Sequence, residues 1–179
     1  MILESWYWKQ SLLETAQRIK SLKAAENVSE EQIVLLEKDI FVGFYSVRKL
    51  VETQVKVSDV VRHISLPICW YPNKGIKVTW RNNNKLDELY DFDSGGGEVR
   101  DIWFISGRII HSFIFSPLFT EEGSLEAILF TSDTDKDKRL YSMHIDKVID
   151  LFTLVGNDNL SLIVWRQDPE TGEESTIVE

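Results

Sequence analysis

The sequence predicts an α+β fold in which an N-terminal pair of helices packs on a mainly antiparallel β-sheet meander. Residues 3–25 and 30–53 have the apolar spacing of amphipathic helices, whereas short strand-like segments dominate beyond residue 98. No linker rich in proline, glycine or charge separates the two parts. We therefore expect one α+β domain over residues 1–166, followed by an acidic, disordered tail over residues 167–179.

The first predicted helix, residues 3–25, has one apolar face. Polar side chains lie on the opposite side, which is typical of a helix buried along one face. The apolar arc consists of Trp8, Leu12, Ala16, Ile19 and Leu22.

The second predicted helix, residues 30–53, begins at a capping box formed by Ser29 and Gln32. Its main apolar face is Ile33, Leu36, Ile40, Phe44, Val47 and Val51. A second, interrupted apolar face contains Val34, Leu35, Phe41, Val42 and Tyr45. A helix that is apolar on two sides must pack against other elements on both sides. We therefore expect the first helix to pack on one face, and the sheet or a second copy of the protein to pack on the other.

The next segment, residues 56–71, is ambiguous between helix and strand. A cap at Ser58 favours a short helix that leads into an extended segment, which Pro67 would confine to a sheet edge. Residues 76–80 alternate between apolar and polar, which predicts a half-buried strand. Residues 85–92 remain undecided.

Glycines at 95–97 predict a flexible loop before the β-rich part. After it, residues 99–105 and 108–116 are predicted as strands, because Ser106 and Gly107 form the two-residue connection of a tight hairpin.

A second pair of strands is predicted at residues 125–132 and 139–145. The polar run 133–138 between them is too short for a crossover helix, which indicates antiparallel pairing. A short helix over about 146–155 then separates the last two strands, with Asp146 as its N-cap and Gly156-Asn157 as a left-handed stop. The final strand candidate is 160–165.

The charge of the chain restricts the classes of partner. Its 179 residues include 20 basic and 29 acidic side chains, a formal net charge of −9. Nucleic acids and anionic membranes are bound mainly by arrays of Lys and Arg, so we expect neither as a partner and favour a protein. No segment reads as a leader or a membrane span, so we expect a cytoplasmic protein.

The single cysteine, Cys69, excludes an intramolecular disulfide and a multi-cysteine zinc site. Its neighbours Ile68 and Trp70 are apolar, so we expect a small buried side chain. We expect no cofactor and no metal site.

Two loops resemble ligand motifs only in part. The run Ser94–Gly97 lacks the lysine and hydroxyl of a phosphate-binding loop and lies among carboxylates, so a mobile connection is the better interpretation. Asp133, Asp135 and Asp137 have calcium-loop spacing, but Lys138 replaces the glycine that the motif requires. An exposed hairpin tip explains these residues.

The catalytic candidates are His111 and the carboxylates Asp91, Asp93 and Asp101. A histidine inside an apolar strand is satisfied by hydrogen bonds or acts as a base or ligand. Together these residues define an alternative function, a small hydrolase or nucleotide-processing enzyme with an optional divalent cation.

The leading hypothesis is a non-enzymatic binding protein that associates with itself or with another protein, as adaptors, immunity proteins and antitoxins do. Arg48 is expected to pair with Glu52 rather than to act in catalysis. Trp6 lies off the arc of the first helix, so one of the terminal aromatic residues should be exposed. The predicted partner-binding residues are Trp6, Tyr7, Phe41 and Tyr45.

Overall fold

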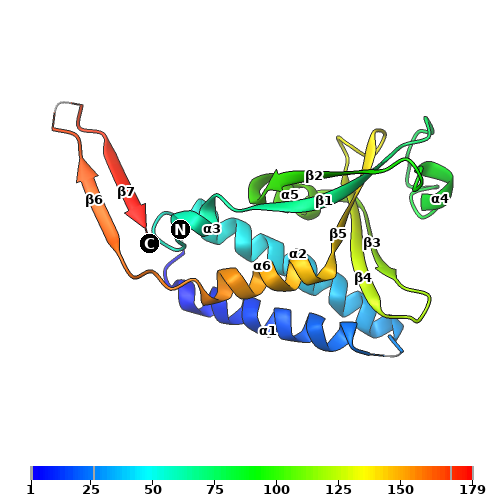
Figure 1. The fold of residues 1–179 in the computed structure, drawn as a ribbon, viewed down its shortest axis with the longest axis horizontal. Coiled ribbons are helices and arrows are strands. Elements are labelled where there is room, and N and C mark those ends of the chain that lie inside the picture. Colours follow the sequence, from blue (N-terminus) through cyan, green and yellow to red (C-terminus); the bar gives the residue numbers. More distant parts are fainter. Residues whose placement is uncertain (1, 26, 170, 179) are drawn as a thin grey trace.

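The computed structural model describes residues 2–25, 27–169 and 171–178, and it shows a layer of helices packed on an antiparallel sheet (Figure 1). The helices are α1 (Ser5–Lys23), α2 (Glu30–Glu52), α3 (Asp59–Arg62), α4 (Leu86–Leu89), α5 (Ile102–Ile110) and α6 (Ile145–Asn157). The strands are β1 (Ser65–Pro72), β2 (Gly96–Asp101), β3 (Ser112–Phe119), β4 (Leu125–Ser132), β5 (Arg139–His144), β6 (Ile163–Gln167) and β7 (Glu174–Val178). The predicted α+β class is confirmed.

Five strands form the main sheet in the order β2-β1-β5-β4-β3, and every neighbouring pair is antiparallel. The strands β3, β4 and β5 follow one another as a meander, as the short connection 133–138 predicts. The pairing of β1 with β5 then joins the β1–β2 pair to this meander.

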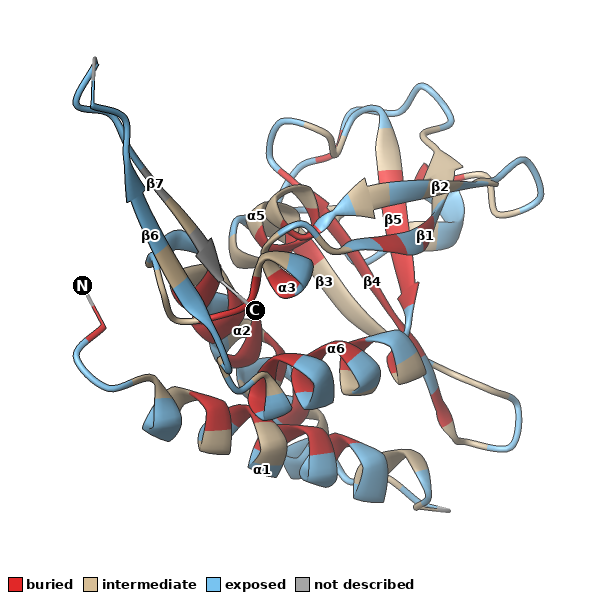
Figure 2. Cartoon of the chain, turned by 60° about the vertical axis from the view of Figure 1, so that its left-hand side comes forward, coloured by how far each residue is buried: buried red, intermediate tan, exposed pale blue. Residues whose placement is uncertain are grey.

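The helical layer is built on α2. Its capping box is present: Ser29 Oγ accepts a hydrogen bond from the Gln32 backbone N–H, and Gln32 Oε1 accepts one from the Ser29 N–H. One side of α2 packs on α1, and another packs on α5 and β3. At its centre, the buried Phe44 ring meets that of Phe152 of α6 with centroids 5.2 Å apart. Buried residues follow the inner faces of the helices, and the outer faces are exposed (Figure 2).

The predicted hairpin around Ser106-Gly107 is wrong, because residues 102–110 form α5. Asp101 caps this helix by accepting the Phe104 backbone N–H at 2.7 Å. Three isoleucines at spacings of three and four face the core, which stabilises a helix despite the β-branched side chains. They are Ile102, Ile105 and Ile109, all fully buried.

The predicted strand over residues 76–80 is also wrong, because this segment is irregular. Val78 is buried and its backbone N–H donates to Asp137, whereas Trp80 is 78% exposed. Together with α4, the segment covers part of the sheet face that lies opposite the main core. The buried residues of this second cluster are Val78, Leu89, Tyr90, Ile114, Leu129 and Leu140.

The segment before the sheet largely follows the prediction. Ser58 caps the short helix α3, and β1 follows it. The strand β1 lies inside the sheet rather than at its edge, but β5 pairs only with residues 69–72. Pro67 therefore lies where β1 has β2 as its only paired neighbour. Two of the three glycines predicted as a loop, Gly96 and Gly97, belong to β2.

The helix predicted over 146–155 is α6, but its cap is His144 rather than Asp146. The His144 side chain accepts the Asp146 backbone N–H at 3.3 Å. The predicted left-handed stop is wrong, because Gly156 lies inside α6 without a positive φ. Its lack of a side chain instead allows close packing on Leu13 of α1.

Beyond α6, β6 and β7 pair as an antiparallel hairpin that projects from the rest of the molecule (Figure 1). Much of this hairpin, including β7, falls in the segment 167–179 for which the sequence predicts a disordered tail. Glu170 and Glu179, which the same prediction includes, lie outside the described residues.

Candidate functional site

The outer face of α2 carries exposed apolar side chains. At 100° per residue, six side chains fall within an arc of about 100° on this face. We call them the α2 strip: Val34, Leu35, Lys38, Val42, Tyr45 and Lys49. The four apolar members are between 46% and 59% exposed. They belong to the face for which the sequence predicted a second cover.

Aromatic contacts define one end of the α2 strip. The Tyr45 ring lies 6.4 Å from that of Trp8 on α1, and Lys49 Nζ lies 5.7 Å from the Tyr45 centroid. Hydrogen bonding to Glu52 raises the pKa of Lys49, so this lysine is charged at neutral pH.

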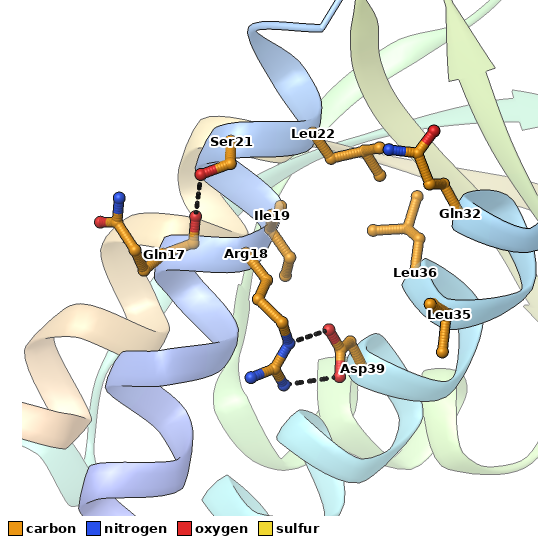
Figure 3. A pocket seen from close by; sticks show the side chains of 9 residues that line it. All are labelled: Gln17, Arg18, Ile19, Ser21, Leu22, Gln32, Leu35, Leu36 and Asp39. Atoms are coloured by element: carbon orange, nitrogen blue, oxygen red, sulfur yellow. Dashed lines mark hydrogen bonds and ion pairs between the residues drawn. The ribbon is translucent and has the colours of Figure 1, made fainter. Parts of the chain in front are cut away.

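The other end of the α2 strip borders a groove of about 330 Å³ between α1 and α2 (Figure 3). Leu22 and Leu36 point into the space between the two helices, beside Leu35. Along one side, the Arg18 guanidinium donates from Nε and Nη2 to the two carboxylate oxygens of Asp39, both at 2.8 Å. This fork joins the two helices along the groove.

Phe41 and Tyr45, both predicted to bind a partner, have different surroundings. Phe41 is half-buried against Phe115 of β3, with ring centroids 4.9 Å apart. The second face of α2 is therefore covered by the sheet at Phe41 and uncovered at Tyr45.

The terminal aromatic residues Trp6 and Tyr7 are 56% and 68% exposed, as the helical arc predicts for Trp6. Their rings pack edge to face with centroids 5.0 Å apart. A pair of rigid aromatic rings at a helix start is a typical anchor for a protein partner.

Arg48 has the structural role that the sequence predicts. Its Nε donates to Glu52 at 2.6 Å, its Nη1 donates to the Trp103 carbonyl at 3.1 Å, and its guanidinium stacks 4.4 Å from the Trp103 ring centroid. These contacts fix α2 to α5.

The structure also contains a hollow that sequence reasoning missed. On the sheet face opposite the main core, Gly97, Cys69 and Ser142 lie side by side on β2, β1 and β5. Their small side chains leave a hollow of about 540 Å³. Cys69 is exposed here, so the prediction that it is buried is wrong. To predict that these three residues are neighbours, one would need both the alternation of side chains along each strand and the pairing register of the three strands.

His144 also lines this hollow, but its ring is already engaged. Its Nδ1 lies 3.3 Å from the Asp146 backbone nitrogen and 3.5 Å from the Asp146 carboxylate, so the ring is held at the start of α6.

The predicted catalytic residues are not brought together around His111. This histidine is the exposed C-cap of α5, and Asp101 is the N-cap at the other end. Nine helical residues separate the two ends by about 14 Å. Asp91 and Asp93 lie before β2, where Asp91 accepts the Asp93 backbone N–H.

The calcium-like acidic residues each have a structural partner. Asp135 binds Arg108, Asp137 accepts the Val78 N–H, and Asp133 binds Lys136. Over residues 2–25, 27–169 and 171–178, no three His, Cys, Asp or Glu side chains gather into a metal-binding group.

Comparison of the chain with protein-family models, with curated proteins and with solved structures gives no match. In the described part of the chain, no helix is both long and apolar enough to cross a membrane.

Proposed function

We propose that this chain is a protein-binding or self-associating protein whose interface is centred on the α2 strip. The observation that carries the proposal is the exposure of Val34, Leu35, Val42 and Tyr45 on a helix that is buried on its other sides. Exposed apolar side chains that gather along one face of a helix are typical of an interaction site.

The composition of the strip supports a protein partner in particular. A tyrosine and aliphatic side chains form the centre, the charged Lys38 and Lys49 are interspersed, and the Arg18–Asp39 ion pair lies at the edge of the groove. Aromatic and aliphatic side chains beside charged groups are common in protein interfaces.

The test uses Val42→Glu in the full chain, with Val60→Glu as the matched control. Val60, on α3, is 77% exposed and lies outside the strip, so the control introduces the same charge elsewhere. Molar mass is measured by light scattering at about 50 µM, and circular dichroism checks the fold of each variant.

We expect the wild type and Val60→Glu to be associated, with themselves or with one copurifying protein, and Val42→Glu to have lost that association. The proposal is wrong if the wild type has the mass of a monomer and retains no protein whose recovery depends on Val42.

A further inference from the structure

The β6–β7 hairpin lacks the support that a two-stranded unit normally needs. Among the described residues, its strands contact each other extensively, and neither makes an extensive contact with another helix or strand. It extends away from the helices and is mostly exposed (Figure 2). An isolated two-stranded hairpin is at best marginally stable in water, so this one requires a further contact.

The hairpin carries its own apolar anchors. Ile163 and Trp165 are 53% and 61% exposed and lie two residues apart in β6, so their side chains are on the same face. Leu162, immediately before the strand, is 48% exposed. Tryptophan is among the residues that contribute most to binding when an interface buries them.

Resting on the proposed function, we propose that the β6–β7 hairpin is an arm that docks on the α2 strip of a second copy. Length is one argument. From Val34 to Lys49 the strip is about 22 Å long at 1.5 Å per residue, and the five residues of β6 span about 17 Å.

Charge is the second argument. Lys38 lies near the middle of the strip and makes no ion pair with another described residue. The hairpin beyond Trp165 carries Asp168, Glu173 and Glu174, against the single basic residue Arg166. Basic and acidic groups that face each other steer association and set the register of an interface.

The anchoring of the hairpin base favours a second copy over the chain's own strip. At the end of α6, the Asp158 carbonyl accepts a hydrogen bond from Lys9 Nζ, and its carboxylate accepts the Ser58 N–H at 2.7 Å. These bonds tie the start of the connection that leads to the hairpin to α1 and α3, and the hairpin extends away from the helices (Figure 2). In a two-fold symmetric dimer, the hairpin of each copy would dock on the α2 strip of the other, so both hairpins and both strips would be buried.

The first experiment compares Trp165→Ser with Trp80→Ser in the full chain. Trp80 is also an exposed tryptophan, at 78% against 61% for Trp165, and it is far from the hairpin in sequence. We expect Trp165→Ser to raise the dimer dissociation constant at least about 30-fold and Trp80→Ser to leave it within threefold. Sedimentation velocity measures both constants.

The second experiment identifies the docking site. Copies labelled with ¹⁵N are mixed with unlabelled copies and treated with a carbodiimide, which joins lysine to carboxylate at ion-pair distance. We expect crosslinked peptides that join Lys38 to Glu173 or Glu174 and contain one labelled and one unlabelled partner.

The outcomes separate this inference from the proposed function. A dimer that Val42→Glu disrupts but Trp165→Ser does not would overturn the arm and leave the proposed function standing. Crosslinks without mixed isotopes would show that the arm folds onto its own chain and would also overturn the inference. A dimer that only Trp165→Ser disrupts would overturn both, and so would a monomeric wild type.

Discussion

At the scale of single residues, two helical glycines have opposite structural roles. A side chain added at Gly43 of α2 would place its Cβ 2.4 Å from the Phe152 ring, which is fully buried. At Gly107 of α5, an added Cβ would meet nothing within 4 Å. The first glycine is required for close packing of α2 on α6, and the second only lowers the helix propensity of α5.

The same substitution should therefore change stability in opposite directions at the two positions. We expect Gly43→Ala to lower the free energy of unfolding by about 1–3 kcal/mol through overpacking. Gly107→Ala should raise it by about 0.5–1 kcal/mol, because alanine restricts the unfolded chain and favours the helix. Urea unfolding followed by circular dichroism measures both values. Equal changes at the two positions would contradict this interpretation of the packing.

At the scale of elements, α5 depends on its N-cap. Its sequence is rich in isoleucine and aromatic residues, which favour strands, and it contains a glycine. The hydrogen bond from the Phe104 N–H to the Asp101 carboxylate satisfies one of the free donors at the helix start. Burial of three isoleucines on one side then outweighs the local preference for a strand.

Asp101→Ala should accordingly lower the free energy of unfolding by about 1 kcal/mol, whereas Asp101→Asn should lower it by only a few tenths because asparagine caps equally well. Chemical denaturation of the three proteins under the same conditions provides the comparison. If Asn and Ala were equally destabilising, the side chain at 101 would contribute through its charge and not through the cap.

The same helix shows where sequence patterns stop being sufficient. The capping box at Ser29 and the polar connection 133–138 are local signals, and both predict the elements that the structure contains. The sequence around Ser106-Gly107 is compatible with either a hairpin turn or a helix. The packing of Ile105 and Ile109 against α2 and the sheet favours the helix.

The candidate site was predictable to a similar extent. Helical periodicity predicts that α2 has a second apolar face and that Trp6 is exposed. It does not predict that Phe115 covers Phe41 and leaves Tyr45 uncovered, because that depends on where β3 lies in the sheet. The row of Gly97, Cys69 and Ser142 likewise depends on the register of three strands distant in sequence.

At the scale of the whole molecule, acidic residues outnumber basic ones, and several carboxylates are stabilised in their charged form. Hydrogen bonds from Arg48 and then Lys49 lower the pKa of Glu52. A hydrogen bond from Lys23 lowers the pKa of Asp146, which ties the end of α1 to the start of α6. Partial burial opposes both shifts, because desolvation disfavours the charged carboxylate.

The lowered pKa values determine how stability depends on pH. A carboxyl group with a lower pKa in the folded state stabilises the fold above its unfolded pKa, near the ordinary 4.5 for Glu52, and loses that contribution as the pH falls through the folded pKa. Stability should therefore decrease in acid. Because Glu52 is one-third exposed, its own contribution should stay below about 1 kcal/mol.

Glu52→Gln isolates this contribution. We expect the variant to be less stable than the wild type at pH 7, and the difference should shrink as the pH falls through the lowered folded-state pKa of Glu52, below which the wild-type carboxyl is protonated in both states. Glu88→Gln is the control, because Glu88 pairs only with Lys85 on the surface and is 65% exposed. Urea unfolding at each pH gives the differences. A difference for Glu52→Gln that stays constant from pH 7 to pH 3 would mean that the side chain stabilises α2 by packing, with no role for its ion pairs with Arg48 and Lys49.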